Sequence, residues 1–213
     1  MTDSLPPSVR ALPITTLFVD IGGVLLGPGW GHASRQLAAT TFGLEAVEME
    51  LRHHLFFSTY ELGRLSLADY LRQVVFYQPR PFSTADFRAF MFAQSQPYPD
   101  MLALIPQLKA RYHLKIAVVS NEGRELNAHR IQKFGLAGSV DFFVSSSFVG
   151  RSKPDVDIFR LALDLAQVPA AQLLYLDDQQ LFIGIAADLG TQCICHVDYF
   201  SICTQLAAFG LPL

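Results

Sequence analysis

Four polar sites follow short apolar segments in this 213-residue chain. They are Asp20, the pair Ser120-Asn121, Lys153 in a later loop, and the pair Asp177-Asp178. Taken singly, an aspartate shortly before two glycines fits a turn or a catalytic carboxylate, and an acid pair fits a turn or a metal site. A serine-asparagine pair is more typical of a helix cap. Because a lone carboxylate is costly to bury, Asp20 requires partners that only the fold can bring to it.

Five apolar segments predict the strands that would position these side chains. They cover residues 14–20, 115–120, 141–145, 173–177 and 193–197. The first four are almost continuously apolar, as in a parallel sheet that is covered on both faces. Helical patterns over 100–112 and 155–167 alternate with them, which predicts a doubly wound α/β sheet. Ligands of such sheets bind beyond the carboxyl ends of the strands, so we expect the four polar sites to converge at one edge.

One long segment breaks this alternation. Residues 29–97 contain no convincing strand, but they contain four helical patterns, over 32–42, 46–60, 66–77 and 83–94. Ser83 with Asp86 three positions later resembles the capping box of a helix start. The glycine- and proline-rich stretches GPGWG and QPYPD mark the two ends. We therefore predict an α/β core formed by residues 1–28 and 98–213, with an all-helical insertion at 29–97.

The composition excludes several classes of protein. Hydrophobic residues make up 51% of the chain and charged residues 16%, which excludes a disordered protein. The net charge of −3 gives no basic surface for nucleic acid. No apolar run suffices for a membrane span, and the start shows no signal-peptide pattern, so we expect a soluble cytoplasmic protein. Cys193, Cys195 and Cys203 are a poor disulfide framework and are expected to be small buried residues.

Several segments of the chain resemble the motifs of one enzyme family. The stretch FVDIGGVL resembles its nucleophile motif, AVVSN its second motif, SKPD its lysine motif and YLDDQQ its acidic motif. Within the helical insertion, ELGRLSLADY resembles cap sequences of phosphatase-like members. The family is the haloacid dehalogenase superfamily of hydrolases, and the resemblance covers nearly the whole chain. It implies a Rossmann-like α/β core with a helical cap domain after the first strand.

The resemblance implies a role for each polar site. Asp20 would be a nucleophile that forms an ester intermediate, and Lys153 would neutralise Asp20 and the transferring group. Mg²⁺ would relieve the repulsion between this carboxylate and a dianionic phosphate. The metal ligands would be Asp20, the Gly22 carbonyl, Asp177 and Asp178. The substrate contacts would come from Gly22, Gly23, Ser120, Asn121 and Lys153.

Two positions depart from the family pattern. Phosphatases of the family usually carry a second aspartate two residues after the nucleophile, where this chain has Gly22. That aspartate protonates the leaving alkoxide and later activates water, and losing such help costs about 10²–10⁴-fold in rate. Phe182 stands where many relatives have asparagine. We therefore expect a Mg²⁺-dependent phosphatase of a small phosphorylated metabolite, working through an aspartyl phosphate and slow on esters with poor leaving groups.

Two other functions stay open at this point. A catalytically weakened relative that only binds a ligand or partner would tolerate both departures. A 2-haloacid dehalogenase needs no second aspartate because halide leaves without a proton, and Arg35 or Arg52 could hold its substrate. Such an enzyme needs no metal, however, which leaves the Asp177-Asp178 pair unexplained. A Schiff-base mechanism is excluded because residues 29–97 contain no lysine.

Histidines in the insertion are a further alternative for the missing acid. They are His32, His53 and His54. A histidine on a cap helix is more typical of a surface residue or of a residue with satisfied hydrogen bonds. The substrate and the oligomeric state, including a homodimer, stay open.

Overall fold

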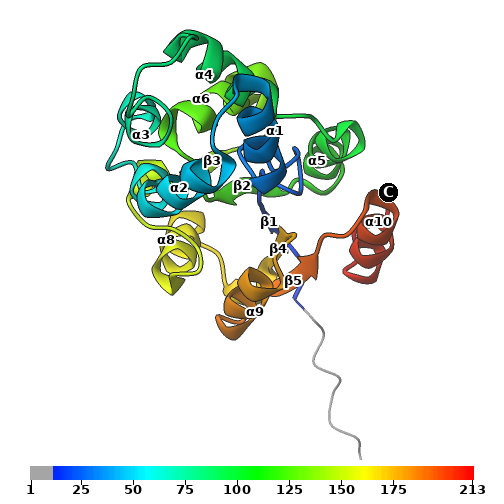
Figure 1. Ribbon diagram of the computed structural model, residues 1–213. Helices are drawn as coiled ribbons and strands as arrows, with labels where there is room; N and C mark the ends of the chain where they lie inside the picture. Colours follow the sequence, from blue (N-terminus) through cyan, green and yellow to red (C-terminus); the bar gives the residue numbers. More distant parts are fainter. Residues whose placement is uncertain (1–11) are drawn as a thin grey trace, which may run out of the picture.

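The computed structural model describes residues 12–213, and five parallel strands form one sheet in its centre (Figure 1). The strands are β1 (Thr16–Val19), β2 (Lys115–Ser120), β3 (Phe142–Ser145), β4 (Leu173–Asp177) and β5 (Gln192–Cys195). Their order is β3-β2-β1-β4-β5, so the chain adds strands first on one side of β1 and then on the other. This confirms the predicted doubly wound α/β sheet. The expectation that the chain starts without a signal peptide falls on residues 1–11, outside the described residues.

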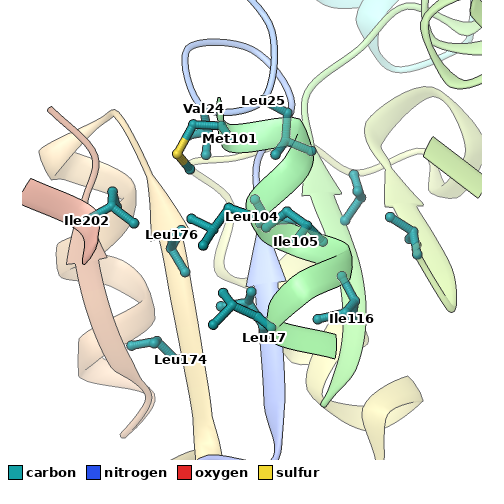
Figure 2. Packing of buried hydrophobic residues seen from close by; sticks show 14 of the residues in the cluster. Leu17, Val24, Leu25, Met101, Leu104, Ile105, Ile116, Leu174, Leu176 and Ile202 are labelled. Atoms are coloured by element: carbon teal, nitrogen blue, oxygen red, sulfur yellow. The ribbon is translucent and has the colours of Figure 1, made fainter. Parts of the chain in front are cut away.

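Both faces of the sheet are covered, which accounts for the nearly continuous apolar strands. The covering helices are α5 (Pro99–Tyr112), α10 (Tyr199–Ala208), α8 (Val156–Ala166) and α9 (Gln180–Asp188). Leu174 and Leu176 of β4 belong to the cluster formed with α5 and α10, and Figure 2 shows this packing. Leu173 and Tyr175 alternate with them and pack on the other face, in the cluster with α8 and α9. The two helix pairs lie on opposite sides of the sheet in Figure 1.

Between β1 and α5 the chain forms four further helices with a hydrophobic cluster of their own. They are α1 (His32–Phe42), α2 (Ala46–Glu61), α3 (Leu67–Val74) and α4 (Thr84–Ala93). The cluster contains four buried aromatic rings, with Trp30 edge-on to Phe87 and Tyr60 stacked on Tyr70. The capping box of Ser83 and Asp86 is present. How the chain divides into domains, with 29–97 as one of them, stays a prediction.

Two elements are shorter or shifted relative to their predictions. The helix expected over 66–77 ends at Val74, and Pro79 and Pro81 follow soon after; residues before proline avoid the helical region. The strand expected over 193–197 is β5, which pairs only with β4 and ends at Cys195, opposite Asp177. The cysteines are free and half-buried rather than fully buried.

The remaining elements connect the strands. Helices α6 (Arg124–Lys133), after β2, and α7 (Ser146–Val149), after β3, begin at the edge of the sheet where the polar sites lie. The short 3₁₀ turns η1 (Leu136–Gly138) and η2 (Ala170–Gln172) precede β3 and β4 at the opposite edge. Across residues 12–213, none of the helices is both long and apolar enough to cross a membrane.

Candidate active site

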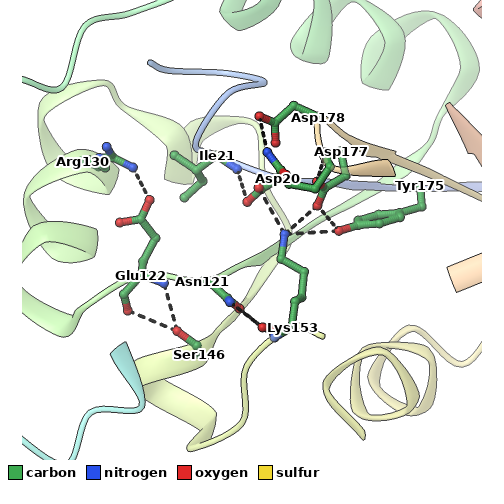
Figure 3. A network of polar contacts seen from close by, with 11 residues as sticks. Asp20, Ile21, Asn121, Glu122, Arg130, Ser146, Lys153, Tyr175, Asp177 and Asp178 are labelled. Atoms are coloured by element: carbon green, nitrogen blue, oxygen red, sulfur yellow. Dashed lines mark hydrogen bonds and ion pairs between the residues drawn. The ribbon is translucent and has the colours of Figure 1, made fainter. Parts of the chain in front are cut away.

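The ends of β1 and β4 bring Asp20, Asp177 and Lys153 together (Figure 3). The Asp20 amide donates to the Leu176 carbonyl at 3.0 Å, which continues the pairing of β1 with β4 by one residue. Lys153 Nζ lies 3.1 Å from Asp20 Oδ2 and 2.6 Å from Asp177 Oδ2. The lysine side chain is 1% exposed, so this cation is held between two carboxylates with little solvent around it.

A reciprocal pair of hydrogen bonds fixes the loop that delivers Lys153. The Asn121 side chain donates to the Lys153 carbonyl and accepts from the Lys153 amide, both at 2.8 Å. The polar atoms of Asn121 are therefore engaged in positioning the lysine, a role that the sequence alone does not indicate. Its direct substrate contact stays a prediction. The ring of Phe182 lies 4.8 Å from Lys153 Nζ and forms a cation–π contact on another side.

Asp20, Asp177 and Asp178 form a compact acidic cluster. Each offers a carboxylate oxygen, and these atoms lie within 4.8 Å of one another. Burial raises the pKa of Asp20; Lys153 opposes this effect and the negative charge of Asp177 adds to it. A hard divalent cation that prefers oxygen ligands would relieve this repulsion, so the donor set fits Mg²⁺.

The two acids of the pair Asp177-Asp178 have different surroundings. Asp177 is fully buried and accepts hydrogen bonds from Lys153, the Tyr175 hydroxyl and the Gln179 amide. Asp178 is half-buried and borders a cavity. Gly23 lies against Asp178 with φ of 77°, and a Cβ there would lie 2.3 Å from Asp178 Oδ2. Glycine at position 23 allows the backbone to approach the acid this closely. Because Asp178 is less buried than Asp177 and borders the cavity, it is the more accessible ligand of the two.

A cavity of about 320 Å³ opens above Asp20 and has walls from two parts of the chain. We call the wall from the strand ends and their loops the core half: Asp20, Gly22, Gly23, Ser120, Asn121, Glu122 and Asp178. We call the opposite wall the insertion half: Trp30, Arg35, Phe57, Tyr60 and Glu61. The other predicted site residues thus meet in one half of one cavity, while Lys153 and Asp177 lie buried beside Asp20 without bordering the cavity, and we count both with the core half.

The two arginines considered for a dehalogenase are engaged elsewhere. Arg35 donates to both oxygens of Glu50, at 2.7 and 2.6 Å, and to the Trp30 carbonyl at 2.8 Å. These hydrogen bonds lower the pKa of Glu50 to about 2. Arg52 pairs with Glu48 and does not border the cavity. Neither guanidinium is free to hold the carboxylate of a small acid.

The histidines of the insertion do not border the cavity either. His53 is buried and hydrogen-bonds through Nδ1 to the Tyr70 hydroxyl at 2.7 Å. Burial lowers its pKa to about 3, and Arg35 adds to this effect, so the ring is neutral. His32 and His54 lie beside Glu50 on the exposed side of the insertion. These surroundings agree with histidines that are structural or at the surface.

Sequence reasoning missed three charged residues at this site. Glu122 and Arg130 form a buried ion pair, and Glu122 Oε1 would lie 3.9 Å from a Cβ on Gly22. Glu61, from the insertion, borders the same cavity as Glu122. The only sequence signals were that Glu122 directly follows Ser120-Asn121 and that Glu61 begins the cap-like stretch ELGRLSLADY.

Comparisons with known proteins identify the family of the chain and support its fold. Residues 14–187 match the family model of haloacid dehalogenase-like hydrolases. The HAD family enzyme BT-2542 of Bacteroides thetaiotaomicron has a TM-score of 0.75 at 17% identity, over 90% of this chain and 98% of that one. Another structure of that enzyme, with a TM-score of 0.74 at 18% identity over 89% and 98% of the two chains, is a complex with magnesium and inorganic phosphate.

Two further structures share the same fold. A predicted HAD-like hydrolase from Porphyromonas gingivalis has a TM-score of 0.73 at 18% identity, over 92% and 98% of the two chains. The L-2-haloacid dehalogenase of Xanthobacter autotrophicus has a TM-score of 0.60 at 16% identity, over 94% and 85%. No curated protein matches the chain. At these identities the structural neighbours show the fold alone.

Proposed function

The chain belongs to the haloacid dehalogenase-like hydrolases, and we propose that it is a Mg²⁺-dependent phosphatase of a small phosphorylated metabolite. One observation carries the proposal: Lys153 lies between Asp20 and Asp177, while Asp20 and Asp178 face the same cavity. A buried ammonium beside a carboxylate at the floor of a cavity suits a nucleophile that must receive a negatively charged phosphoryl group.

In this proposal an Asp20 oxygen attacks phosphorus, and the bond between phosphorus and the leaving oxygen breaks. Lys153 holds Asp20 in place and offsets negative charge on the phosphoryl group. Ser120 and the backbone of Gly22 and Gly23 bind the phosphoryl oxygens. Water then attacks the phosphorus of the aspartyl phosphate, which releases phosphate and restores the Asp20 carboxylate.

Mg²⁺ would be held by Asp20, the Gly22 carbonyl and Asp178, with Asp177 behind them. When bound, it supplies a positive charge that allows a carboxylate and a dianionic phosphate to approach each other. The crowded acids and the space that Gly23 leaves beside Asp178 support this assignment.

We further propose that residues 29–97 act as a cap that shapes the pocket for the leaving group. The insertion half of the cavity and the separate hydrophobic cluster of α1–α4 support this role. A cytoplasmic location and a homodimer stay predictions. A dehalogenase is disfavoured because Arg35 is already paired with Glu50 and because its chemistry leaves the acidic cluster without a task.

A direct assay tests this function. Phosphate release from p-nitrophenyl phosphate and from a panel of sugar and alcohol phosphates is measured with and without Mg²⁺, and halide release from 2-haloacids is measured in parallel. We expect Mg²⁺-dependent phosphate release that Asp20→Asn abolishes. Halide release without metal would favour the dehalogenase, and no turnover of either class would favour a binding protein.

A further inference from the structure

The proposed phosphatase lacks an acid at Gly22, yet the cavity holds two further carboxyl side chains, Glu61 and Glu122. We propose that Glu61, at the end of helix α2, is the general acid and base of the reaction. It would protonate the leaving oxygen from the insertion half of the cavity. This inference rests on the proposed phosphatase activity and deepens it.

The backbone of Glu61 is fastened to the α/β core. The Ser146 hydroxyl donates to the Glu61 carbonyl at 2.7 Å and accepts from the Glu122 amide at 2.9 Å, the second of these contacts being drawn in Figure 3. Two residues later, a Cβ on Gly63 would lie 2.2 Å from the Ser147 carbonyl oxygen, so the chain passes directly over α7. The end of α2 therefore has a fixed position over the site, as a catalytic side chain requires.

A second set of contacts holds the same seam between insertion and core. A Cβ on Gly123 would lie 2.0 Å from the Tyr60 ring, so the residue before Glu61 packs directly on the loop after β2. The Leu67 amide donates to Glu125 Oε1 at 2.9 Å. Leu126 of α6 belongs to the hydrophobic cluster of the insertion. This seam fixes the backbone on both sides of Glu61, which borders the same cavity as Asp20.

The Glu61 carboxyl group is suited to carry a proton. It forms no salt bridge with any cation among residues 12–213 and it borders the cavity. Burial raises its pKa to about 7; the negative charges of Glu122, from the loop after β2, and of Asp20, from the end of β1, add to the effect, and Lys153 opposes it. A carboxyl group with such a pKa donates and accepts protons near neutrality.

Glu122 is the competing candidate, and its surroundings argue against it. It is paired with Arg130 in a buried contact. Arg130 also donates to the Ser95 hydroxyl at 3.0 Å and to the Gly27 carbonyl at 3.3 Å, and it fills the space beside Gly29. Protonating Glu122 would leave Arg130 buried without its counter-charge, which is costly. Burial raises the pKa of Glu122 as well, but Arg130 opposes this effect, and this fixed counter-charge suits Glu122 to remain a carboxylate that favours the protonated form of Glu61.

Glu61 would give up one proton when the aspartyl phosphate forms and regain one when it is hydrolysed. As Asp20 attacks phosphorus, the electron pair of the breaking bond stays on the leaving oxygen, which takes the Glu61 proton and departs as an alcohol. Glu61, now a carboxylate, removes a proton from the water that attacks the aspartyl phosphate. Phosphate is released, Asp20 regains its carboxylate, and Glu61 is protonated again. Esters with poor alkyl leaving groups should therefore be true substrates, contrary to the expectation from Gly22 alone.

A leaving-group series tests Glu61. We would measure kcat/KM of wild type, Glu61→Gln and the control Glu45→Gln, an exposed residue before the start of the same helix. The series runs from alkyl phosphates to p-nitrophenyl phosphate. We expect Glu61→Gln to lose about 10²–10⁴-fold on alkyl phosphates and little on p-nitrophenyl phosphate, which needs no acid. The control should match wild type throughout.

The pH profile of wild type gives a second test that needs no variant. With alkyl phosphates kcat/KM should fall as pH rises through about 7, and with p-nitrophenyl phosphate this limb should be absent. If wild type is active but depends on the leaving group in the same way as Glu61→Gln, the role of Glu61 is overturned and the phosphatase is not. The same holds if the pH profiles for the two kinds of ester coincide. No Asp20-dependent phosphate release from any ester overturns both.

Discussion

In the core half of the cavity every functional side chain follows a strand of the sheet, whereas in the insertion half the side chains come from helices α1 and α2 and the loop before them. The core half concentrates charge: Lys153 lies between Asp20 and Asp177, and Asp178 completes an acidic cluster. In the insertion half Arg35 is neutralised by Glu50, and Glu61 alone offers a carboxyl group to the cavity.

This difference suggests a division of labour. The carboxyl ends of parallel strands fix charges rigidly, which suits attack on a phosphoryl group and stabilisation of its charge. The insertion half combines aromatic rings, such as Trp30 and Phe57, with one group that can exchange a proton near neutrality. Phosphoryl chemistry would belong to the core half, and leaving-group binding and protonation to the insertion half.

Replacing Lys153 by methionine should produce the largest effect, because it breaks the core half. The change leaves Asp20 and Asp177 buried without their cation, which should destabilise the fold by about 3–5 kcal/mol. Phosphate release should fall by about 10²–10³-fold on every ester, whatever its leaving group. The exposed Lys133→Met is the control. Urea unfolding and steady-state kinetics measure both effects, and wild-type values in Lys153→Met would contradict the role of the core half.

A further test moves the acid from the insertion half of the cavity to the core half. Gly22 does not have a positive φ, and a Cβ there would meet nothing nearer than 3.8 Å. Gly22→Asp, introduced into Glu61→Gln, should therefore restore turnover of alkyl phosphates by up to about 10²–10⁴-fold and change p-nitrophenyl phosphate little. Gly138→Asp, at an open and exposed position, is the control. Equal recovery on both classes of ester would argue against a transferred acid.

Metal binding should depend on the core half alone. Mg²⁺ at about 100 times its Kd should add about 2.7 kcal/mol to the free energy of unfolding of wild type. Asp178→Asn should lose this gain, while Glu61→Gln and the exposed Asp188→Asn should keep it. Titration calorimetry and thermal unfolding measure the effect. If Mg²⁺ does not change the melting temperature of wild type, the proposed metal site is wrong.

The smallest expected effect is the pH dependence of stability that arises in the insertion half. Folding raises the pKa of Glu61 from its ordinary 4.5 to about 7, so the folded state binds the proton more tightly. The contribution of this proton to the free energy of unfolding is complete below pH 4.5 and is lost as pH rises through about 7. The pKa change sets an upper limit of about 3 kcal/mol, and because solvent in the cavity screens these charges, wild type should lose about 1–2 kcal/mol over this window relative to Glu61→Gln. Urea unfolding measures this loss. A difference in the free energy of unfolding between the two proteins that stays constant with pH would contradict the raised pKa.

Most of the core half could be predicted from the sequence, but Glu122 and the insertion half could not. Asp20, Lys153 and Asp177 follow strands or their loops, and parallel strands must place their carboxyl ends at one edge, so their meeting follows from local patterns. Glu61 reaches the cavity only because Gly63 and Gly123 allow α2 to pack on the core. Such packing depends on contacts between distant segments, which periodicity does not encode.

The covalent state of Asp20 during turnover distinguishes a nucleophile from a turn residue. Wild-type protein with Mg²⁺ and p-nitrophenyl phosphate is quenched in acid within the first turnover, and the peptide that contains Asp20 is analysed by mass spectrometry. We expect this peptide to gain one phosphoryl group, and Asp20→Asn to show neither the adduct nor phosphate release. Phosphate release at the wild-type rate from Asp20→Asn, with no phosphorylated peptide in either protein, would contradict this expectation.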